Sequence, residues 1–225
     1  MSSKLNIVML GATGAVGTEV VSTLVEMPEL VSLTLLGRRE VEGVSHEGLR
    51  QYKADIFDPS SYAMYLQGHD TAICTLGVGE PSKVSREDFV RIDKQAVLDF
   101  ATACKEAGVQ HFQLLGSIGS DAASRSFFLR TKSELEDALK ALDFERLSLF
   151  QPSMILTPEN RYGLTQALTL WGWPKLDFLP TGSRTKYRGI KVATLGRAIA
   201  LYARSDKSGV ETLRWNDFQS LAGRA

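Results

Sequence analysis

The chain has 225 residues, a length that can bury one sizeable hydrophobic core, and nothing in its composition marks a second independent domain. Lysine plus arginine and aspartate plus glutamate each number 26, so the chain lacks the basic excess that would neutralise a nucleic-acid backbone. With no charged-then-apolar leader and no apolar run of membrane-spanning length, we expect a single domain over residues 1–225, soluble and cytoplasmic, without nucleic-acid or membrane partners.

The first predicted strand, Leu5–Leu10, ends in Gly11-Ala-Thr-Gly14-Ala-Val-Gly17 and is followed by a helical pattern over residues 19–27. Between a strand and a helix, three glycines at this spacing permit a tight turn, close approach of the backbone to a pyrophosphate and close helix–strand contact. The N–H groups at the helix start then face the anion. We therefore predict a dinucleotide site, with an ordinary glycine-rich loop as the alternative, at Gly11, Thr13, Gly14, Ala15, Val16 and Gly17.

The second predicted strand, over residues 33–36, carries no acidic residue at its end, where an acid would bind the ribose of NAD. The chain continues instead with Gly37, Arg38 and Arg39. The two guanidinium groups suit forked, charge-assisted hydrogen bonds to a 2′-phosphate, and Gly37 leaves that phosphate room to approach. This pattern favours NADP(H) over NAD(H), although Glu40 could contact the ribose or neutralise Arg39.

The next segments continue the alternation of strands and helices. A strand over 49–53 precedes Asp55 and Ile56, which lie where the adenine of a dinucleotide is expected. A short helix over 58–68 and a short apolar strand over 71–76 follow. Because the carboxyl end of that strand points at the cofactor crevice, we also place three residues from this end there: Thr75, Leu76 and Gly77.

A long helix is predicted over 85–108, opened by a variant capping box in which Asp88 replaces the usual glutamate or glutamine. A fifth strand over 111–115, a helix over 127–142 and a sixth strand over 147–150 follow it. Strict alternation at this spacing predicts an α/β fold with a doubly wound parallel sheet of the Rossmann type.

After Gln151 the alternation loosens, and the chain becomes rich in residues typical of irregular, bulky packing: Pro158, Trp171, Trp173, Pro174, Pro180 and Trp215. We predict a small C-terminal lobe over about 152–225 that covers a substrate or binds a partner. A helix over 192–202 and an edge strand over 208–213 should return to the main body. Pro152 and Ser153 are predicted among the cofactor-binding residues.

Several of these motifs resemble the atypical short-chain dehydrogenase/reductases. The resemblance covers most of residues 5–153 and is carried by the glycine turn, by Gly37-Arg38-Arg39 and by the segments over 74–77, 89–93, 114–117 and 128–136. The branch that includes the Tat-interacting tumour-suppressor oxidoreductase and the NmrA-like proteins is the most similar part of that family. The resemblance implies an NAD(P)-binding oxidoreductase that acts on a small carbonyl or related substrate.

In that family, a serine ends the fifth strand and a Tyr-x-x-x-Lys pair lies on the following helix. Residues four apart share a helix face, so the lysine can hold the ribose hydroxyls while it lowers the pKa of the tyrosine. The resemblance assigns these catalytic roles to Ser117 and Lys132, but Phe128 stands at the tyrosine position and cannot donate a proton. Ser117, a water or a tyrosine of the later lobe would have to replace it. Asp93 falls where the family often carries an asparagine, and a surface charge is the equal alternative.

Other polar groups give weaker signals. Four cations form a basic cluster that is either a solvated loop or a clamp for an anionic substrate or the pyrophosphate: Arg184, Lys186, Arg188 and Lys191. Cys74 and Cys104 are expected to be buried and reduced. The three histidines lie in unrelated segments without ligand spacing, so no metal site is predicted.

The sequence leaves two classes of function open. One is an NADPH-dependent reductase or isomerase-like enzyme for a small molecule, with an altered proton donor. The other is a catalytically silent NADP(H)-binding redox sensor or regulatory protein that acts through a protein partner. Phe128 favours the silent protein, whereas Ser117 and Lys132 favour the enzyme.

Overall fold

The computed structural model describes residues 4–157 and 182–223. Its main feature is a seven-stranded sheet in the order β3-β2-β1-β4-β5-β6-β9, in which every neighbouring pair is parallel. The strands are β1 (Leu5–Leu10), β2 (Leu30–Gly37), β3 (Leu49–Lys53), β4 (Thr71–Cys74), β5 (His111–Leu115), β6 (Arg146–Phe150) and β9 (Gly209–Leu213). The strand order reverses between β1 and β4, which is the switch point where open α/β sheets bind their ligands. The predicted doubly wound parallel sheet is confirmed.

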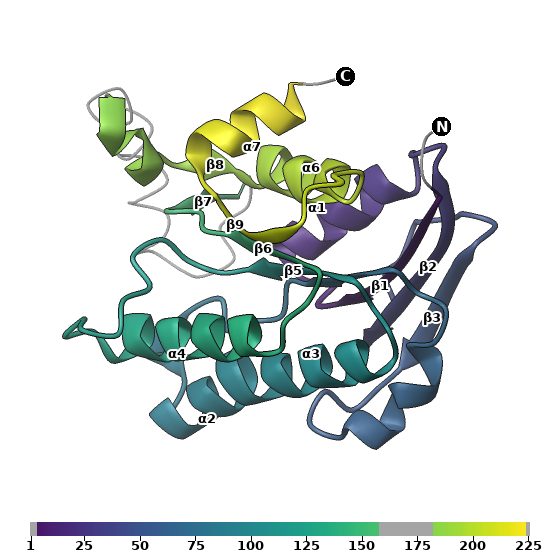
Figure 1. Ribbon diagram of the computed structural model, residues 1–225, viewed down its shortest axis with the longest axis horizontal. Helices are drawn as coiled ribbons and strands as arrows, with labels where there is room; N and C mark the ends of the chain where they lie inside the picture. The colour runs from purple at the N-terminus through teal and green to yellow at the C-terminus, as the bar shows by residue number, and fades with distance from the viewer. Residues whose placement is uncertain (1–3, 158–181, 224–225) are drawn as a thin grey trace.

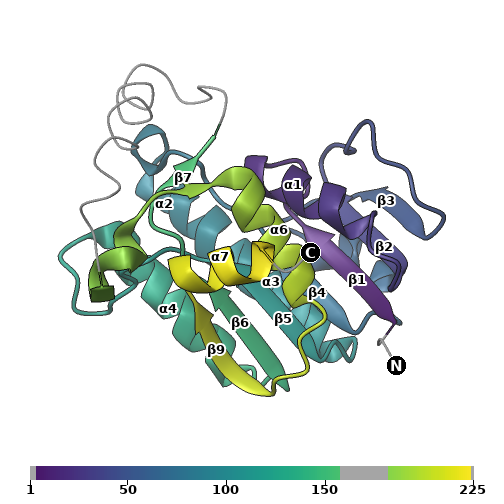
Figure 2. The same ribbon diagram turned by 90° about the horizontal axis from the view of Figure 1, so that it is seen from above.

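Helices cover both faces of this sheet (Figure 1). One face carries α1 (Ala15–Leu24), α6 (Val192–Tyr202) and α7 (Trp215–Ala222), and Figure 2 looks down on these three helices. The other face carries α2 (Arg86–Val90), α3 (Ala96–Glu106) and α4 (Phe127–Ala141). Alternate residues of β1 serve the two cores, because Ile7 and Met9 pack on the α1 side and Val8 and Leu10 on the α3 side.

The α1 and α6 helices pack closely where they cross. A Cβ at Gly196 of α6 would lie 2.3 Å from the Cβ of Glu19 on α1, so only glycine permits this approach. Val20 and Val21 of α1 and Leu195 of α6 share one hydrophobic core. The helix that follows the glycine turn is therefore held from outside by a segment near the end of the described chain.

Two predicted helices differ from the observed ones. The segment predicted as a helix over 58–68 forms two short 3₁₀ turns, η1 (Pro59–Ser61) and η2 (Ala63–Tyr65). The predicted helix over 85–108 is divided by a π-helical turn, η4 (Arg91–Gln95), which joins α2 to α3. A hydrophobic repeat cannot distinguish an α from a π turn, since both keep the apolar residues on the same side over so short a distance.

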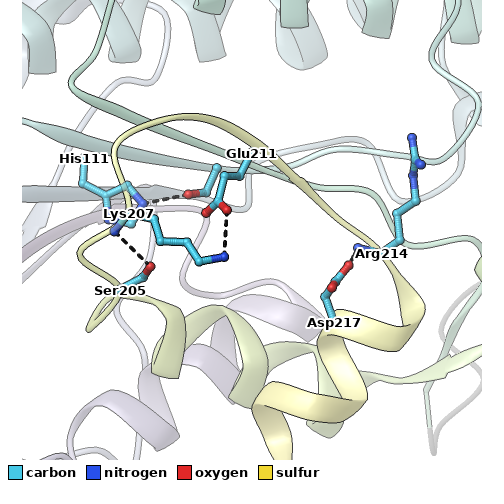
Figure 3. A network of polar contacts seen from close by, with 7 residues as sticks. His111, Ser205, Lys207, Glu211, Arg214 and Asp217 are labelled. Carbon is cyan, nitrogen blue, oxygen red and sulfur yellow. Dashed lines mark hydrogen bonds and ion pairs between the residues drawn. The ribbon is translucent and has the colours of Figure 1, made fainter.

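The helix over Trp215–Ala222 was not predicted, and it follows directly on the predicted edge strand β9. Figure 3 shows the polar contacts that fix this corner. Lys207 Nζ lies 3.0 Å from the Glu211 carboxylate, and the Arg214 backbone N–H donates to Asp217 Oδ2 at 2.8 Å, which caps α7. The capping residue is an arginine rather than serine, threonine, aspartate or asparagine, so the usual sequence signal for a helix start is missing.

Two short strands, β7 (Ile155–Leu156) and β8 (Ile190–Lys191), pair in parallel outside the main sheet. A 3₁₀ segment, η5 (Gly182–Tyr187), leads to β8, and the Trp215 indole N–H donates to the Gly189 carbonyl at 2.9 Å. The five prolines and tryptophans between 158 and 180, on which the predicted C-terminal lobe rests, lie outside the described residues, so the lobe stays a prediction. Within residues 4–157 and 182–223, no helix is long and apolar enough to cross a membrane.

Candidate functional site

The glycine turn after β1 is required partly by the protein itself. Gly11 has φ +91°, and a Cβ there would lie 2.5 Å from the Leu76 backbone nitrogen. A Cβ at Gly17 would lie 2.2 Å from the Gly11 carbonyl oxygen. Thr75 donates its hydroxyl to that same oxygen at 3.0 Å, which ties the turn to the end of β4. Gly11 and Gly17 are therefore glycines for structural reasons.

Gly14 is different, because no such reason applies to it. Its φ of −74° is open to any residue, and an added Cβ would meet only the Gly11 oxygen, at 3.3 Å. It is the N-cap of α1 and provides no side chain to cap the helix, whose first turn also holds no acidic residue. The first N–H groups of α1 thus face an open surface with no side-chain acceptor, as a phosphate site at a helix start requires.

A small hollow of about 70 Å³ lies between this turn and the end of β2. Six predicted cofactor residues line it: Gly11, Thr13, Arg38, Arg39, Ile56 and Leu76. Arg38, Arg39 and Glu40 are exposed, and among the described residues none of the three takes part in an ion pair. Glu40 therefore does not neutralise Arg39. Asp55 lines neither hollow and accepts the Phe57 backbone N–H at 3.0 Å.

A larger cavity of about 340 Å³ lies on the other side of the glycine turn and shares Leu76 with the first. It opens at the carboxyl ends of β1, β4, β5 and β6. Ten predicted site residues line it: Gly14, Ala15, Val16, Thr75, Leu76, Gly77, Ser117, Lys132, Pro152 and Ser153. Phe128 lines it too. The structure thus brings predicted phosphate-binding and catalytic residues to one cavity, which adjoins the smaller hollow at Leu76, and we call the two together the crevice.

Lys132 reaches this cavity from α4 as part of a buried ion pair. Its Nζ lies 2.8 Å from Asp93 Oδ1, and the two side chains are only 8% and 2% exposed. The second Asp93 oxygen, Oδ2, accepts the Val78 backbone N–H at 2.7 Å. Asp93 is therefore not a surface charge. It is a buried anchor that joins the π turn to α4 and to the loop after β4.

Two phenylalanine rings complete the surroundings of the ammonium. The Lys132 Nζ lies 6.0 Å from the ring centres of both Phe89 and Phe128, whose rings are 5.2 Å apart. Among the described residues, the Ser117 hydroxyl makes one long hydrogen bond, at 3.4 Å, to the Ile118 carbonyl, so it can turn toward a ligand. Phe128 places a hydrocarbon edge in the cavity at the position where the resemblance implies a phenol.

A buried polar chain behind the cavity wall was not predicted from the sequence. The Gln151 amide donates to both carboxylate oxygens of Glu136, at 3.0 and 3.1 Å, and its oxygen accepts from Arg214 at 3.3 Å. A Cβ at Gly116 would lie 3.4 Å from Glu136 Oε1. Glu136 lies one helical turn after Lys132, which is the only sequence signal that it faces the same wall.

Of the predicted basic cluster, the described side chains of Lys186, Arg188 and Lys191 do not line this crevice. Lys186 lies over the Tyr187 ring and Arg188 over the Trp215 ring, at 5.2 and 5.1 Å, while the Arg184 side chain is outside the described set. The thiol of Cys74 is fully buried, and burial raises its pKa to about 12, so it remains protonated near neutral pH. Within the described residues, no group of three potential ligands could hold a metal ion.

Comparison with known proteins agrees with this geometry. A family model described as NAD(P)H-binding matches residues 11–147. The rat protein HTATIP2 is 32% identical over 198 residues, which make up 86% of this chain and 79% of that protein. The solved structure of MoeE5 in complex with UDP-glucuronic acid and NAD superposes with a TM-score of 0.71 at 18% identity, covering 92% of this chain and 75% of that one. At that identity the likeness establishes the fold alone.

Fungal relatives correct the expected location. Protein FMP52, mitochondrial, of Meyerozyma guilliermondii is 31% identical over 151 residues, 66% of this chain and 64% of that protein. The Emericella nidulans protein of the same name is 28% identical, and the chain spans 66% of its length. These names contradict the cytoplasmic location, which is wrong. It was inferred from the lack of a charged-then-apolar leader and of a membrane-spanning apolar run, and neither observation distinguishes the cytoplasm from a mitochondrion.

Proposed function

Because the chain belongs to the NAD(P)H-binding family as an atypical short-chain dehydrogenase/reductase, we propose that it binds NADP(H) along this crevice and reduces a small carbonyl compound slowly. The observation that carries the proposal is Gly14. Its missing side chain leaves space in which, among the described residues, only the Gly11 oxygen comes near, in the cavity that Lys132 and Ser117 also line. A pyrophosphate would use that space, since a side chain at this point would block the approach of the phosphates to α1.

The adenine end supports a preference for the phosphorylated cofactor. Arg38 and Arg39 stand at the end of β2, exposed and without an ion pair among the described residues, beside the Ile56 wall. A 2′-phosphate there would gain charge-assisted hydrogen bonds, whereas an unmodified ribose would find no carboxylate lining this hollow, since the exposed Glu40 does not line it. The same arginines therefore favour NADP(H) and provide nothing specific for NAD(H).

The nicotinamide end supports hydride chemistry only in part. The bound cofactor would supply or accept a hydride at this end. Lys132 would hold the ribose hydroxyls, and the Ser117 hydroxyl would orient a substrate oxygen. Phe128 offers no proton to that oxygen, so the proton comes from Ser117 or from a water in the cavity. A missing general acid typically lowers the rate by about 10²–10⁴-fold, which is why slow turnover is expected.

A second candidate function rests on the same wall. The Lys132 charge is already neutralised by Asp93 at 2.8 Å, and Phe128 is apolar, so cofactor binding is retained while the acid is lost. These properties suit a protein that binds NADP(H) and reports its state to a protein partner. Both candidate functions require NADP(H) binding, but only the enzyme turns over a substrate.

Calorimetric titration with NADPH and NADH, followed by rates of NADPH oxidation with an aldehyde, a ketone and a quinone, tests the proposal. Tighter binding of NADPH and slow reduction of one compound are expected. Equal affinity for both cofactors would contradict the NADP(H) preference, and absence of binding would contradict the whole proposal. Tight binding with no reduction of any compound would favour the sensor over the enzyme.

A further inference from the structure

We propose that Asp93 sets the relative affinity of the crevice for the oxidised and the reduced nicotinamide, and is thus a specificity-determining residue for the redox form. This inference rests on the proposed function, because it needs a nicotinamide cofactor in the 340 Å³ cavity. It goes further in giving one buried carboxylate a role in choosing between two forms of that cofactor.

The position of Asp93 follows from the local backbone. The π turn over Arg91–Gln95 interrupts the α-helical ladder between α2 and α3, and such turns commonly redirect a side chain at functional sites. Here the Asp93 carboxylate points into the protein and lines the cavity, 2% exposed. Both oxygens are bonded, one to the Lys132 ammonium and one to the Val78 N–H, so the carboxylate is fixed in place.

Asp93 and Lys132 are the two ionisable side chains among the described residues that line this cavity. Together they leave its wall without net charge. If Asp93 were neutral, as the asparagine common in related reductases would be, the wall would carry the Lys132 charge alone. The net charge of the cavity wall therefore depends on whether residue 93 carries a negative charge.

The two redox forms of the cofactor differ in charge where they meet this wall. The oxidised nicotinamide ring is positively charged, whereas the reduced ring is neutral. A lone buried ammonium would repel the oxidised ring and leave the reduced ring almost unaffected, because charges interact strongly where water is excluded. Asp93 cancels that repulsion, so this crevice tolerates the oxidised form better than a wall with a lone lysine would.

A purely structural role for Asp93 predicts a different result. The contacts to Lys132 and Val78 position the loop after β4 and the end of the lysine, and both forms of the cofactor need them equally. Losing them would weaken the two affinities by the same factor. The ratio of the two dissociation constants therefore separates the charge effect from the positioning effect.

The experiment measures dissociation constants for NADP⁺ and NADPH by calorimetry in the parent protein and in Asp93→Asn. Asparagine keeps the size of the side chain and removes its charge. We expect the NADP⁺/NADPH ratio of dissociation constants to rise about tenfold, as one uncompensated charge at short range implies. Lys132→Met should lower the ratio, and the double variant Asp93→Asn/Lys132→Met, uncharged again, should return it toward the parent value.

Glu134→Gln is the matched control. The Glu134 carboxylate pairs with Lys94 at 2.6 Å and joins the same two segments, the π turn and α4, but on the surface. Its removal should leave the ratio unchanged. A ratio unmoved in Asp93→Asn, in a parent that binds both forms, would overturn this inference alone. A parent that binds neither form would overturn the proposed function.

Discussion

The two ends of the crevice use their charged residues in opposite ways. At the adenine end, Arg38 and Arg39 are exposed and, among the described residues, form no ion pairs. At the nicotinamide end, the Lys132 charge is buried, paired with Asp93 and flanked by two phenylalanine rings. At the first end, the described residues provide no partner for the positive charges, whereas at the second end the protein itself provides one, Asp93.

This difference teaches that binding and catalysis are separable in the fold. Unpaired cations and uncapped N–H groups gain free energy only when an anion arrives, which favours retention of the cofactor. A paired ammonium beside an apolar ring gains little from a substrate oxygen and offers it no acidic proton. On the proposed function, the chain thus keeps the parts that hold a dinucleotide and has Phe128 where related reductases carry a proton donor.

The contrast between the two ends of the crevice depends most on the phosphates of the cofactor lying at Gly14. The substitution Gly14→Val should abolish cofactor binding in calorimetry while circular dichroism shows an intact fold, because φ there is −74° and an added Cβ, 3.3 Å from the Gly11 oxygen, needs only a small shift of that oxygen. As a contrast, Gly17→Val should destabilise the fold itself, since its Cβ would lie 2.2 Å from a carbonyl oxygen. Undiminished affinity in a folded Gly14→Val protein would show that the cofactor lies elsewhere.

Arg38→Ala tests the adenine end by itself. A lost charge-assisted hydrogen bond costs about 1.5–3 kcal/mol, so NADPH should bind roughly ten- to a hundredfold more weakly. The NADH affinity should stay nearly constant, because NADH has no 2′-phosphate. Titrations with both cofactors measure this, and Arg50→Ala on the neighbouring exposed strand β3 serves as the charge-matched control. An equal loss for both cofactors would mean that Arg38 does not select the phosphate.

Phe128→Tyr tests the nicotinamide end. A phenol in the cavity should raise the rate of any NADPH-dependent reduction about tenfold. This gain is below the range typical of general acid catalysis, because Asp93 already neutralises the lysine that would lower the pKa of the phenol. Steady-state rates on one aldehyde, ketone and quinone panel measure this. A brisk parent activity that falls in Phe128→Tyr would show that the site uses another proton donor and needs the phenylalanine as a pocket wall.

His111 lies outside both ends of the crevice, at the start of β5, and it affects stability rather than binding or turnover. Burial, together with the nearby Arg146 charge, lowers its pKa from 6.5 to about 3. The unfolded chain therefore binds a proton that the folded one refuses as pH falls below 6.5, and stability should decrease by up to about 1.4 kcal/mol per pH unit toward pH 3. Urea unfolding between about pH 7 and pH 4 measures this change in the free energy of unfolding. A His111→Gln protein should show a shallower decrease, and equal slopes would contradict this assignment.

The fold could be predicted because its signals are local. Strands β1, β3 and β5 and helix α6 were predicted with the observed bounds, because short apolar runs between glycines and helical repeats mark such elements. Helix α7 was missed since its N-cap is Arg214. The Rossmann order of the strands then follows from right-handed crossovers, which leave few alternatives.

The site was predictable only where sequence neighbours are also neighbours in space. The residues after β1, β2 and β4 meet because carboxyl ends of parallel strands share one edge. The pairing of Asp93 with Lys132 depends on a π turn and on the packing of α4 against it, and no local pattern encodes either. Asp93 was therefore left between two interpretations, and its burial excludes one of them, the surface charge.

The close crossing of α1 and α6 has a consequence for how the protein is made. On the ribosome, the segment bearing the glycine turn emerges before Val192–Tyr202, and until that helix follows, the outer apolar face of α1 lacks its cover. Until then Val20 and Val21 are open to chaperones and to unwanted association. The glycine turn is thus translated before the helix that supports it, so a nascent chain interrupted before Val192 would carry the dinucleotide motif without its packed support.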